Sequence, residues 1–240
     1  PPHTRGPTPA NLTTYSVQKM FKKLTSAIYS FSMSRSRLAA HWRPLIDHSI
    51  ARSRKVRGGN YVQLATVAAD GAPRVRTVVQ RGIVTLKGAR PAFRFITDLR
   101  SQKVAQIEED SRGEMCWWFA KSSEQYRVSG ELVLVGDATE DEALRSLRLE
   151  QWTNLRDTAR EQFYWAQPGL PLDEAGDDAS AGAAALSASD DATAIPPPPP
   201  EFLLVLLLPQ SVDYLRLTDN ARCVFELGGD GNWSAVDVNP

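Results

Sequence analysis

The residues whose types and spacing favour chemistry are concentrated between Arg74 and Lys103. This stretch contains eight Lys and Arg residues and a single acid, Asp98, although the whole chain has a formal net charge of zero. A local excess of positive charge on a neutral protein indicates a site for an anion. Within the stretch, the run Thr97–Lys103 (TDLRSQK) ends a predicted strand and begins a predicted helix. A helix start offers free backbone N–H groups, and this run adds hydroxyl, guanidinium and ammonium donors, so the pattern predicts a phosphate site.

The two arginines of the preceding predicted strand do not share a face. If residues 75–80 form a regular strand, Arg76 and Arg81 point to opposite faces, because side chains alternate along a strand. Both can reach one ligand only if the strand bulges, and Gly82 permits such a bulge. Taken alone, this strand is equally consistent with a solvated strand whose arginines form salt bridges.

Aromatic and amide side chains follow on the next pair of predicted strands. Trp117 and Trp118 are adjacent, so they point to opposite faces and at least one is expected in the core. Gln125 carries a donor and an acceptor and can bind the edge of a heterocycle, although most glutamines are simply solvated. The run Glu140–Glu142 opens a predicted helix, and we interpret these acids as capping residues rather than catalytic ones.

The cysteines and histidines exclude several kinds of site. Cys116 and Cys223 are the only cysteines and lack metal-ligand spacing, which predicts a reducing compartment and no disulfide framework. His3, His41 and His48 all precede the predicted core, so we expect neither a metal site nor a Ser-His-Asp triad. No segment approaches about 20 consecutive apolar residues, so we expect no membrane span. Nucleic-acid binding is a weaker alternative, because the basic strand has few aromatics for base stacking.

The elements that must position these residues are short strands with a few helices. Apolar residues at helical spacing predict a docking helix over Trp42–Arg54, and two β-branched segments joined by Ala-Ala-Asp-Gly predict a hairpin. The predicted strands are Asn60–Val67, Pro73–Gly82, Ala92–Thr97, Glu114–Phe119, Glu124–Val135, Glu201–Pro209 and a final hairpin over Gly228–Gly231, and the other helices are Ser101–Glu109 and Thr139–Phe163. This mainly β pattern favours a barrel or a sandwich.

Two segments differ in composition from the predicted domain, residues 41–240. Residues 1–46 contain seven Lys and Arg residues and no acid, so residues 1–40 are predicted to be a disordered or transit-like tail. The protein is then expected in the cytoplasm, or in mitochondria or plastids if the tail is a transit peptide; a true start at Met33 is a further alternative. Residues 171–200 contain six acids, no Lys or Arg, and five consecutive prolines, which predicts a disordered acidic Ala/Pro-rich insertion.

Four motifs in order carry a family resemblance. They are R-T-V-V-x-R-G from Arg76, F-x-x-x-T-D-x-R-S-x-K from Phe93, C-W-W-F from Cys116 and E-Q-Y-R-V-x-G from Glu124. The series resembles the pyridoxamine 5'-phosphate oxidase-like FMN-binding split-barrel family. Within this family it resembles a cyanobacterial and eukaryotic subgroup, whose members often end in V-N-P, more than it resembles the authentic oxidases. The resemblance extends from about Trp42 to Pro240 and is interrupted by the acidic insertion.

The resemblance implies a fold, a cofactor and an assembly. The fold is a mainly β, α+β, six-stranded antiparallel split β-barrel with flanking helices, and FMN binds at the interface of a homodimer. Arg76, Ser101 and Lys103 match residues that hold the FMN phosphate, and Gln125 matches a glutamine at the isoalloxazine edge. The full predicted FMN-binding set is Arg76, Thr77, Val78, Val79, Arg81, Ile96, Thr97, Arg100, Ser101, Gln102, Lys103, Gln125 and Arg222.

The substrate side of the resemblance is less complete. Arg81 stands where the family has a lysine that reaches towards the flavin and the substrate. Trp152, Arg156 and Arg160 stand where the authentic oxidases use Tyr, Arg and Ser to bind the substrate phosphate, so only the arginine is kept. In those enzymes an Arg-x-His loop covers the substrate, and this chain lacks the loop because the segment between Leu215 and Arg222 is shorter. The resemblance therefore implies FMN binding more strongly than it implies the oxidation of pyridoxamine 5'-phosphate.

Three functions remain open from the sequence. The first is an FMN-dependent oxidoreductase that oxidises pyridoxamine or pyridoxine 5'-phosphate with O₂, a reaction of vitamin B6 metabolism. The second is a reductase that uses FMN and a nicotinamide cofactor to reduce another small molecule. The third is a flavin-binding protein without turnover.

Overall fold

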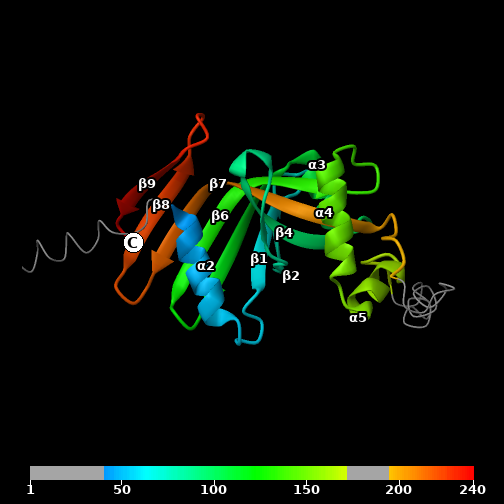
Figure 1. The fold of residues 1–240 in the computed structure, drawn as a ribbon, viewed down its shortest axis with the longest axis horizontal. Coiled ribbons are helices and arrows are strands. Elements are labelled where there is room, and N and C mark those ends of the chain that lie inside the picture. The colour runs from blue at the N-terminus through cyan, green and yellow to red at the C-terminus, as the bar shows by residue number, and fades with distance from the viewer. Residues whose placement is uncertain (1–40, 172–194) are drawn as a thin grey trace, which may run out of the picture.

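The computed structural model describes residues 41–171 and 195–240 (Figure 1). The predicted N-terminal tail, residues 1–40, and residues 172–194 of the predicted insertion lie outside the described residues. Within the described part of the chain, no helix is long and apolar enough to cross a membrane.

The described chain forms a nine-stranded antiparallel sheet with helices packed against it. The strand order is β2-β1-β5-β6-β7-β4-β3, and β8 pairs with both β7 and β9. The strands are β1 (Tyr61–Val67), β2 (Pro73–Val79), β3 (Ile83–Thr85), β4 (Pro91–Asp98), β5 (Arg112–Phe119), β6 (Glu124–Val135), β7 (Phe202–Arg216), β8 (Ala221–Leu227) and β9 (Trp233–Val238). The predicted fold class is confirmed; the sheet has three strands more than the six expected and does not close into a complete barrel.

The chain bends after β2 so that it meets β4. Gly82 has a φ of 123°, which residues with a side chain rarely adopt. The bend lets the Arg81 N–H donate to Arg94 O at 2.8 Å, and the Arg94 N–H donate to Gly82 O at 2.9 Å. The end of β2 therefore lies against β4, the strand that carries Thr97.

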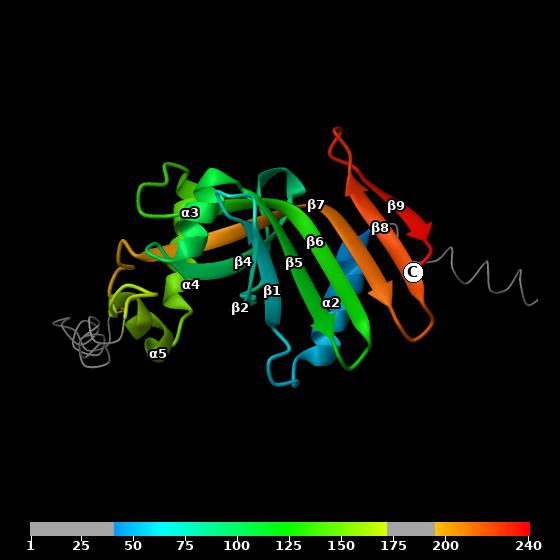
Figure 2. The ribbon, with the colours of Figure 1, turned by 180° about the vertical axis from the view of Figure 1, so that it is seen from behind.

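The main core lies between the inner face of the sheet and helix α2 (Trp42–Ser53). Trp42 and Ile46 of α2 are fully buried in this core, together with alternate residues of the strands such as Trp117. Figure 1 shows α2 across this face, whereas Figure 2 shows the middle of β1, β5 and β6 from behind with no helix in front of them. On that open face, Tyr61 is 54% exposed and Trp118 is 43% exposed. The prediction that Trp117 and Trp118 point to opposite faces is confirmed.

A buried carboxylate attaches α2 to the sheet. Glu124 Oε2 accepts hydrogen bonds from Ser49 Oγ at 2.7 Å and from Ser122 Oγ at 2.5 Å, and its Oε1 accepts one from the Tyr214 hydroxyl at 2.8 Å. Ser49 Oγ also shares a hydrogen bond of 2.9 Å with the Tyr126 hydroxyl. Buried charges are tolerated when they are fully hydrogen-bonded, so this cluster fixes the start of β6, where Gln125 lies.

The first half of β7 is buried on both faces. Val205 and Leu207 belong to the main core, whereas Leu204 and Leu206 pack beneath α4 (Glu142–Thr153). Because both faces are covered, residues 202–208 form a continuous apolar run instead of an alternating one.

Strand β7 continues to Arg216, beyond its predicted end at Pro209. The register between β6 and β7 shifts between Ser129 and Gly130, which accommodates the proline. A Cβ on Gly130 would lie 2.0 Å from Leu208 O, so only glycine allows this close approach.

The helix predicted over Thr139–Phe163 is wrong as a single helix. The chain forms α4 up to Thr153, an extended residue at Arg156, a short α5 (Asp157–Arg160) and a 3₁₀ turn (Glu161–Tyr164). Arg160 stabilises the break, because its Nη2 donates to Thr153 O at 2.8 Å and its Nε donates to Trp152 O at 3.2 Å. Both carbonyls belong to the last turn of α4, and Trp152 O also accepts from the Leu155 N–H at 3.1 Å.

The last part of the predicted insertion, residues 195–200, lies against α4. Trp152 Nε1 donates to Pro196 O at 2.6 Å, and Arg148 Nη2 donates to Pro199 O at 2.9 Å. Arg148 Nε also donates to Phe202 O at 3.0 Å, so the helix fixes the chain just before β7 begins.

Candidate functional site

A compact cluster of hydroxyl and ammonium groups lies where β4 ends and helix α3 (Gln102–Glu109) begins. Lys103 Nζ donates to Thr97 Oγ1 at 2.9 Å and to Ser101 Oγ at 3.0 Å, and the two hydroxyls are 3.0 Å apart. Ser101 Oγ donates to Asp98 O at 2.7 Å, so Ser101 does not cap α3 with its side chain. The first turn of α3 contains no acid, which leaves its positive dipole end available to an anion.

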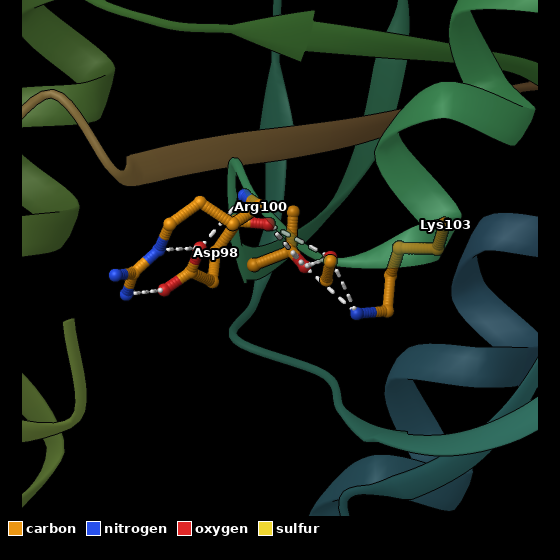
Figure 3. Close-up of polar contacts among 5 residues, drawn as sticks. Asp98, Arg100 and Lys103 are labelled. Carbon is orange, nitrogen blue, oxygen red and sulfur yellow. Dashed lines mark hydrogen bonds and ion pairs between the residues drawn. The ribbon is translucent and has the colours of Figure 1, made fainter. Parts of the chain in front are cut away.

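Asp98 and Arg100 form a separate pair on the same turn. Arg100 Nη2 lies 2.7 Å from Asp98 Oδ2, and Figure 3 shows this pair on the side of the turn away from Lys103. Asp98 Oδ1 also accepts from the Arg100 N–H at 2.7 Å. The pair therefore shapes the turn, and the Arg100 guanidinium points away from the cluster around Lys103.

Arg76 lies next to this cluster on β2. Its Nη1 donates to Thr66 Oγ1 at 2.7 Å and to Leu64 O at 3.1 Å, and its Nη2 donates to Gln106 Oε1 at 2.9 Å. Thr66 and Gln106 were not predicted from the sequence. Gln106 follows Lys103 by three residues on α3, so helical spacing offered a signal for it, whereas nothing in the sequence marked Thr66.

The electrostatics of the cluster favour an anionic ligand. Burial lowers the pKa of Lys103, the charge of Arg76 lowers it further, and Asp98 acts in the opposite direction. Burial also lowers the pKa of Arg76 and of Arg81. The Nε of Arg81 is buried and has no hydrogen-bond partner within the described residues. An anion would compensate the desolvation of these cations, so the residues present fit a phosphate.

A pocket with a volume of about 610 Å³ lies beside the cluster. One wall combines Asp98 with six predicted residues, namely Val78, Val79, Arg81, Ile96, Thr97 and Lys103. The opposite wall runs from α5 to Leu170 and contains no charged residue; it includes Gln162, Phe163, Trp165 and Gln167. The sequence did not predict this second wall, because it lies in the stretch where the helix breaks.

Other predicted residues lie elsewhere. Thr77 and Gln102 are exposed and do not line the pocket. Gln125 and Arg222 form a second group, because Gln125 pairs with Leu215 and Leu215 pairs with Arg222 across β6, β7 and β8. Strands β1 and β5 lie between β2 and β6, so the distance from β2 to Gln125 on β6 is roughly 14 Å at about 4.8 Å per strand spacing.

Of the three residues predicted to bind the substrate phosphate, Trp152 and Arg160 lie together, with the Arg160 guanidinium 5.9 Å from the centre of the Trp152 ring, but both make bonds within the chain. Trp152 is fully buried, and its indole donates to Pro196 O. Arg160 is 4% exposed, and its guanidinium bonds Asp157 and the end of α4. Arg156 is exposed, and none of the three lines the 610 Å³ pocket. Arg81, the fourth predicted substrate residue, does line it.

Comparison with known proteins defines the class of this domain. Residues 39–136 match the family model described as "Pyridoxamine 5'-phosphate oxidase, FMN-binding domain". An Arabidopsis thaliana protein, pyridoxine/pyridoxamine 5'-phosphate oxidase 2, is 31% identical over 211 residues, which cover 84% of this chain and 98% of that protein. A bacterial oxidase from Rhodospirillum rubrum is 29% identical over 101 residues, half of its own length.

Solved structures agree with this class. A pyridoxamine 5'-phosphate oxidase-related, FMN-binding protein from Nostoc punctiforme is 35% identical with a TM-score of 0.72, over 84% of this chain and 98% of that one. PhzG from Burkholderia lata, solved with tetrahydrophenazine-1-carboxylic acid, has a TM-score of 0.69 at 20% identity over 86% and 96% of the chains, and shows the shared fold. The chain thus belongs to the pyridoxamine 5'-phosphate oxidase FMN-binding family, and its cofactor is FMN.

Proposed function

We propose that this protein is an FMN-dependent oxidoreductase that oxidises pyridoxine 5'-phosphate with O₂ to pyridoxal 5'-phosphate and hydrogen peroxide, or pyridoxamine 5'-phosphate with O₂ and water to the same two products and ammonia. The observation that carries the proposal is the cluster of Lys103, Thr97 and Ser101 beside Arg76, which offers hydroxyl and cationic donors to one phosphate. The named activity of the Arabidopsis relative, which this chain matches along 98% of its length, supports the choice of substrate.

The residues have distinct roles in this proposal. Lys103, Ser101, Thr97 and Arg76 bind the FMN phosphate, and Arg81 reaches from the same pocket wall towards the flavin and the substrate. FMN, when bound, supplies the redox chemistry. The chain binds and orients the flavin and shields it with the uncharged wall that contains Trp165.

We further propose a homodimer with FMN between the two copies. The predicted FMN-binding residues form two groups, because Gln125 on β6 lies roughly 14 Å from Val78 and Val79 on β2, across β1 and β5, and Arg222 lies two strands beyond Gln125 on β8. A second copy can supply Gln125 and Arg222 to the flavin that is held by Lys103 of the first copy. The open sheet face, with its exposed Tyr61 and Trp118, is available for such a contact.

A second function, reduction of another small molecule by NADPH through FMN, has its own support. The side chains of Trp152 and Arg160 bond within the chain, and the wall that faces Lys103 across the pocket is uncharged. A substrate without a phosphate would suit that wall better than pyridoxamine 5'-phosphate does.

Two assays with FMN-loaded protein separate these functions. Oxidation in air of pyridoxamine 5'-phosphate, with equal formation of pyridoxal 5'-phosphate and hydrogen peroxide, is the expected result. Bleaching of the flavin absorbance under anaerobic conditions by NADPH, and not by pyridoxamine 5'-phosphate, would instead establish the reductase. Bound FMN that neither donor reduces would contradict both reactions and leave a flavin-binding protein without turnover.

A further inference from the structure

The indole N–H of Trp165 is buried and has no hydrogen-bond acceptor within the described residues. Trp165 itself is half-buried and lines the 610 Å³ pocket on the wall that faces Lys103. Buried polar groups are normally hydrogen-bonded, and an unpaired one is unfavourable until a ligand or water satisfies it. The unpaired N–H therefore indicates a ligand that brings an acceptor atom to this wall.

The other buried indoles of the described chain do not give the same indication. Trp117 Nε1 donates to Gly59 O at 2.9 Å, and Trp152 Nε1 donates to Pro196 O at 2.6 Å. Trp42 Nε1 also lacks an acceptor within residues 41–171 and 195–240, but Trp42 is fully buried in the main core and does not line the 610 Å³ pocket. Trp165 thus combines an unpaired donor with a place in the wall of the pocket.

The chain holds Trp165 at this wall before any ligand binds. The 3₁₀ turn Glu161–Tyr164 ends at Trp165, whose φ of −73° and ψ of 167° are extended. Two residues earlier, Phe163 is 6% exposed, and its ring centre lies 5.9 Å from that of Trp152 and 5.0 Å from that of Phe202. A ligand therefore meets a preformed wall, which reduces the conformational entropy that is lost on binding.

The two walls of the pocket offer different kinds of donor. Lys103 and Arg81 on the first wall are cations, which suit the oxygens of a phosphate. Trp165 on the second wall offers a neutral N–H, and no charged residue accompanies it there. A neutral donor suits a carbonyl oxygen or an unprotonated ring nitrogen. The edge of an isoalloxazine ring carries acceptors of both kinds.

We infer that the indole N–H of Trp165 donates a hydrogen bond to an acceptor atom on the isoalloxazine ring of FMN. The inference rests on the proposed function only in the assignment of this pocket to FMN, whose phosphate Lys103 and its neighbours bind. It does not depend on the reaction that the flavin performs. Trp165 is then a cofactor-binding residue on the wall opposite the phosphate cluster.

Titration of the apoprotein with FMN and with riboflavin, in the wild type and in Trp165→Phe, tests the inference. Phenylalanine keeps an aromatic ring and lacks the N–H, so one neutral hydrogen bond is lost and the phosphate contacts are kept. We expect the Kd to rise about three- to tenfold for both ligands alike. Trp233→Phe is the matched control, because Trp233 is also half-buried but does not line this pocket. It should leave both Kd values unchanged.

A second readout reports on the hydrogen bond itself. Heteronuclear NMR of protein labelled at its tryptophan nitrogens detects the indole N–H groups, and the signal that is missing from Trp165→Phe belongs to Trp165. We expect this signal to move downfield when FMN or riboflavin binds and to stay in place when inorganic phosphate is added.

Three results would overturn the inference. They are Kd values for both ligands that stay unchanged in Trp165→Phe, a rise for FMN alone, which would assign Trp165 to the phosphate, and an indole signal that does not move when riboflavin binds. A protein that shows the expected losses and shifts but oxidises neither pyridoxine nor pyridoxamine 5'-phosphate would contradict only the proposed reaction.

Discussion

Replacement of Lys103 by methionine should weaken FMN binding and, at the same time, stabilise the protein without FMN. Methionine keeps an unbranched apolar side chain and removes the ammonium, which donates to Thr97 and Ser101 at 2.9 and 3.0 Å. A hydrogen bond to a charged group contributes about 1.5–3 kcal/mol, which corresponds to about a ten- to hundredfold increase in the Kd for FMN. Fluorescence titration of the apoprotein with FMN measures this change.

The opposite effect on the apoprotein follows from the desolvation of the same ammonium. Burial and the charge of Arg76 lower the pKa of Lys103 from 10.5, so the unfolded chain binds this proton more tightly than the folded chain. The stability of wild-type apoprotein should therefore rise as the pH increases from the lowered pKa towards 10.5, and Lys103→Met should lack this rise. Removal of the charge should stabilise the apoprotein near neutral pH by roughly 0.5–2 kcal/mol, with Tm increasing by about 2–4 °C per kcal/mol.

Lys87→Met is the matched control, because Lys87 is an exposed lysine of the short 3₁₀ turn before β4. It should change neither the Kd nor the Tm. The reasoning is refuted if Lys103→Met binds FMN as tightly as the wild type, or if its apoprotein loses stability at every pH.

Two further changes test the elements that position the site. Hydrogen bonds lower the pKa of Glu124 below 4.5 although burial alone raises it, so its stabilising effect is present above pH 4.5 and is lost as the pH falls through the folded-state pKa. Glu124→Gln should lower the free energy of unfolding in urea by about 1–3 kcal/mol at pH 7, and by progressively less as the pH falls below 4.5 through the folded-state pKa; a loss that does not change over this acid range would contradict a stabilising carboxylate. Gly130→Ala should destabilise by more than about 2 kcal/mol, since its Cβ would lie 2.0 Å from Leu208 O, whereas Gly229→Ala, with no atom within 4 Å, is the control; equal unfolding midpoints for the two variants would refute the close approach.

Much of the fold could be predicted because local patterns agree with the tertiary structure. Alternation in residues 60–82 identified the β1–β2 hairpin, and the acids at Glu140–Glu142 identified the start of α4, where Asp141 accepts from Ala143 and Leu144 N–H groups. The run of hydroxyl and basic residues from Thr97 to Lys103 predicted the cluster of Thr97, Ser101 and Lys103, since strand end, turn and helix start are contiguous in sequence.

The rest depended on contacts that are distant in sequence. The break after α4 is stabilised by Arg160 bonding back to Thr153, which helical periodicity cannot reveal. The length of β7 depended on a register shift against β6, in which Gln210 of β7 has no partner residue, so Pro209 was wrongly taken as its end. The wall that contains Trp165 arises from the segment after α5, and no local motif marks it.

The most direct test of the central claim compares the affinity of the apoprotein for FMN and for riboflavin. The two ligands share the isoalloxazine ring and differ in the phosphate, for which we assign Arg76, Thr97, Ser101 and Lys103. With at least two charge-assisted bonds of about 1.5–3 kcal/mol each, FMN should bind at least about a hundredfold more tightly than riboflavin. Equal affinities for the two ligands would contradict the phosphate site.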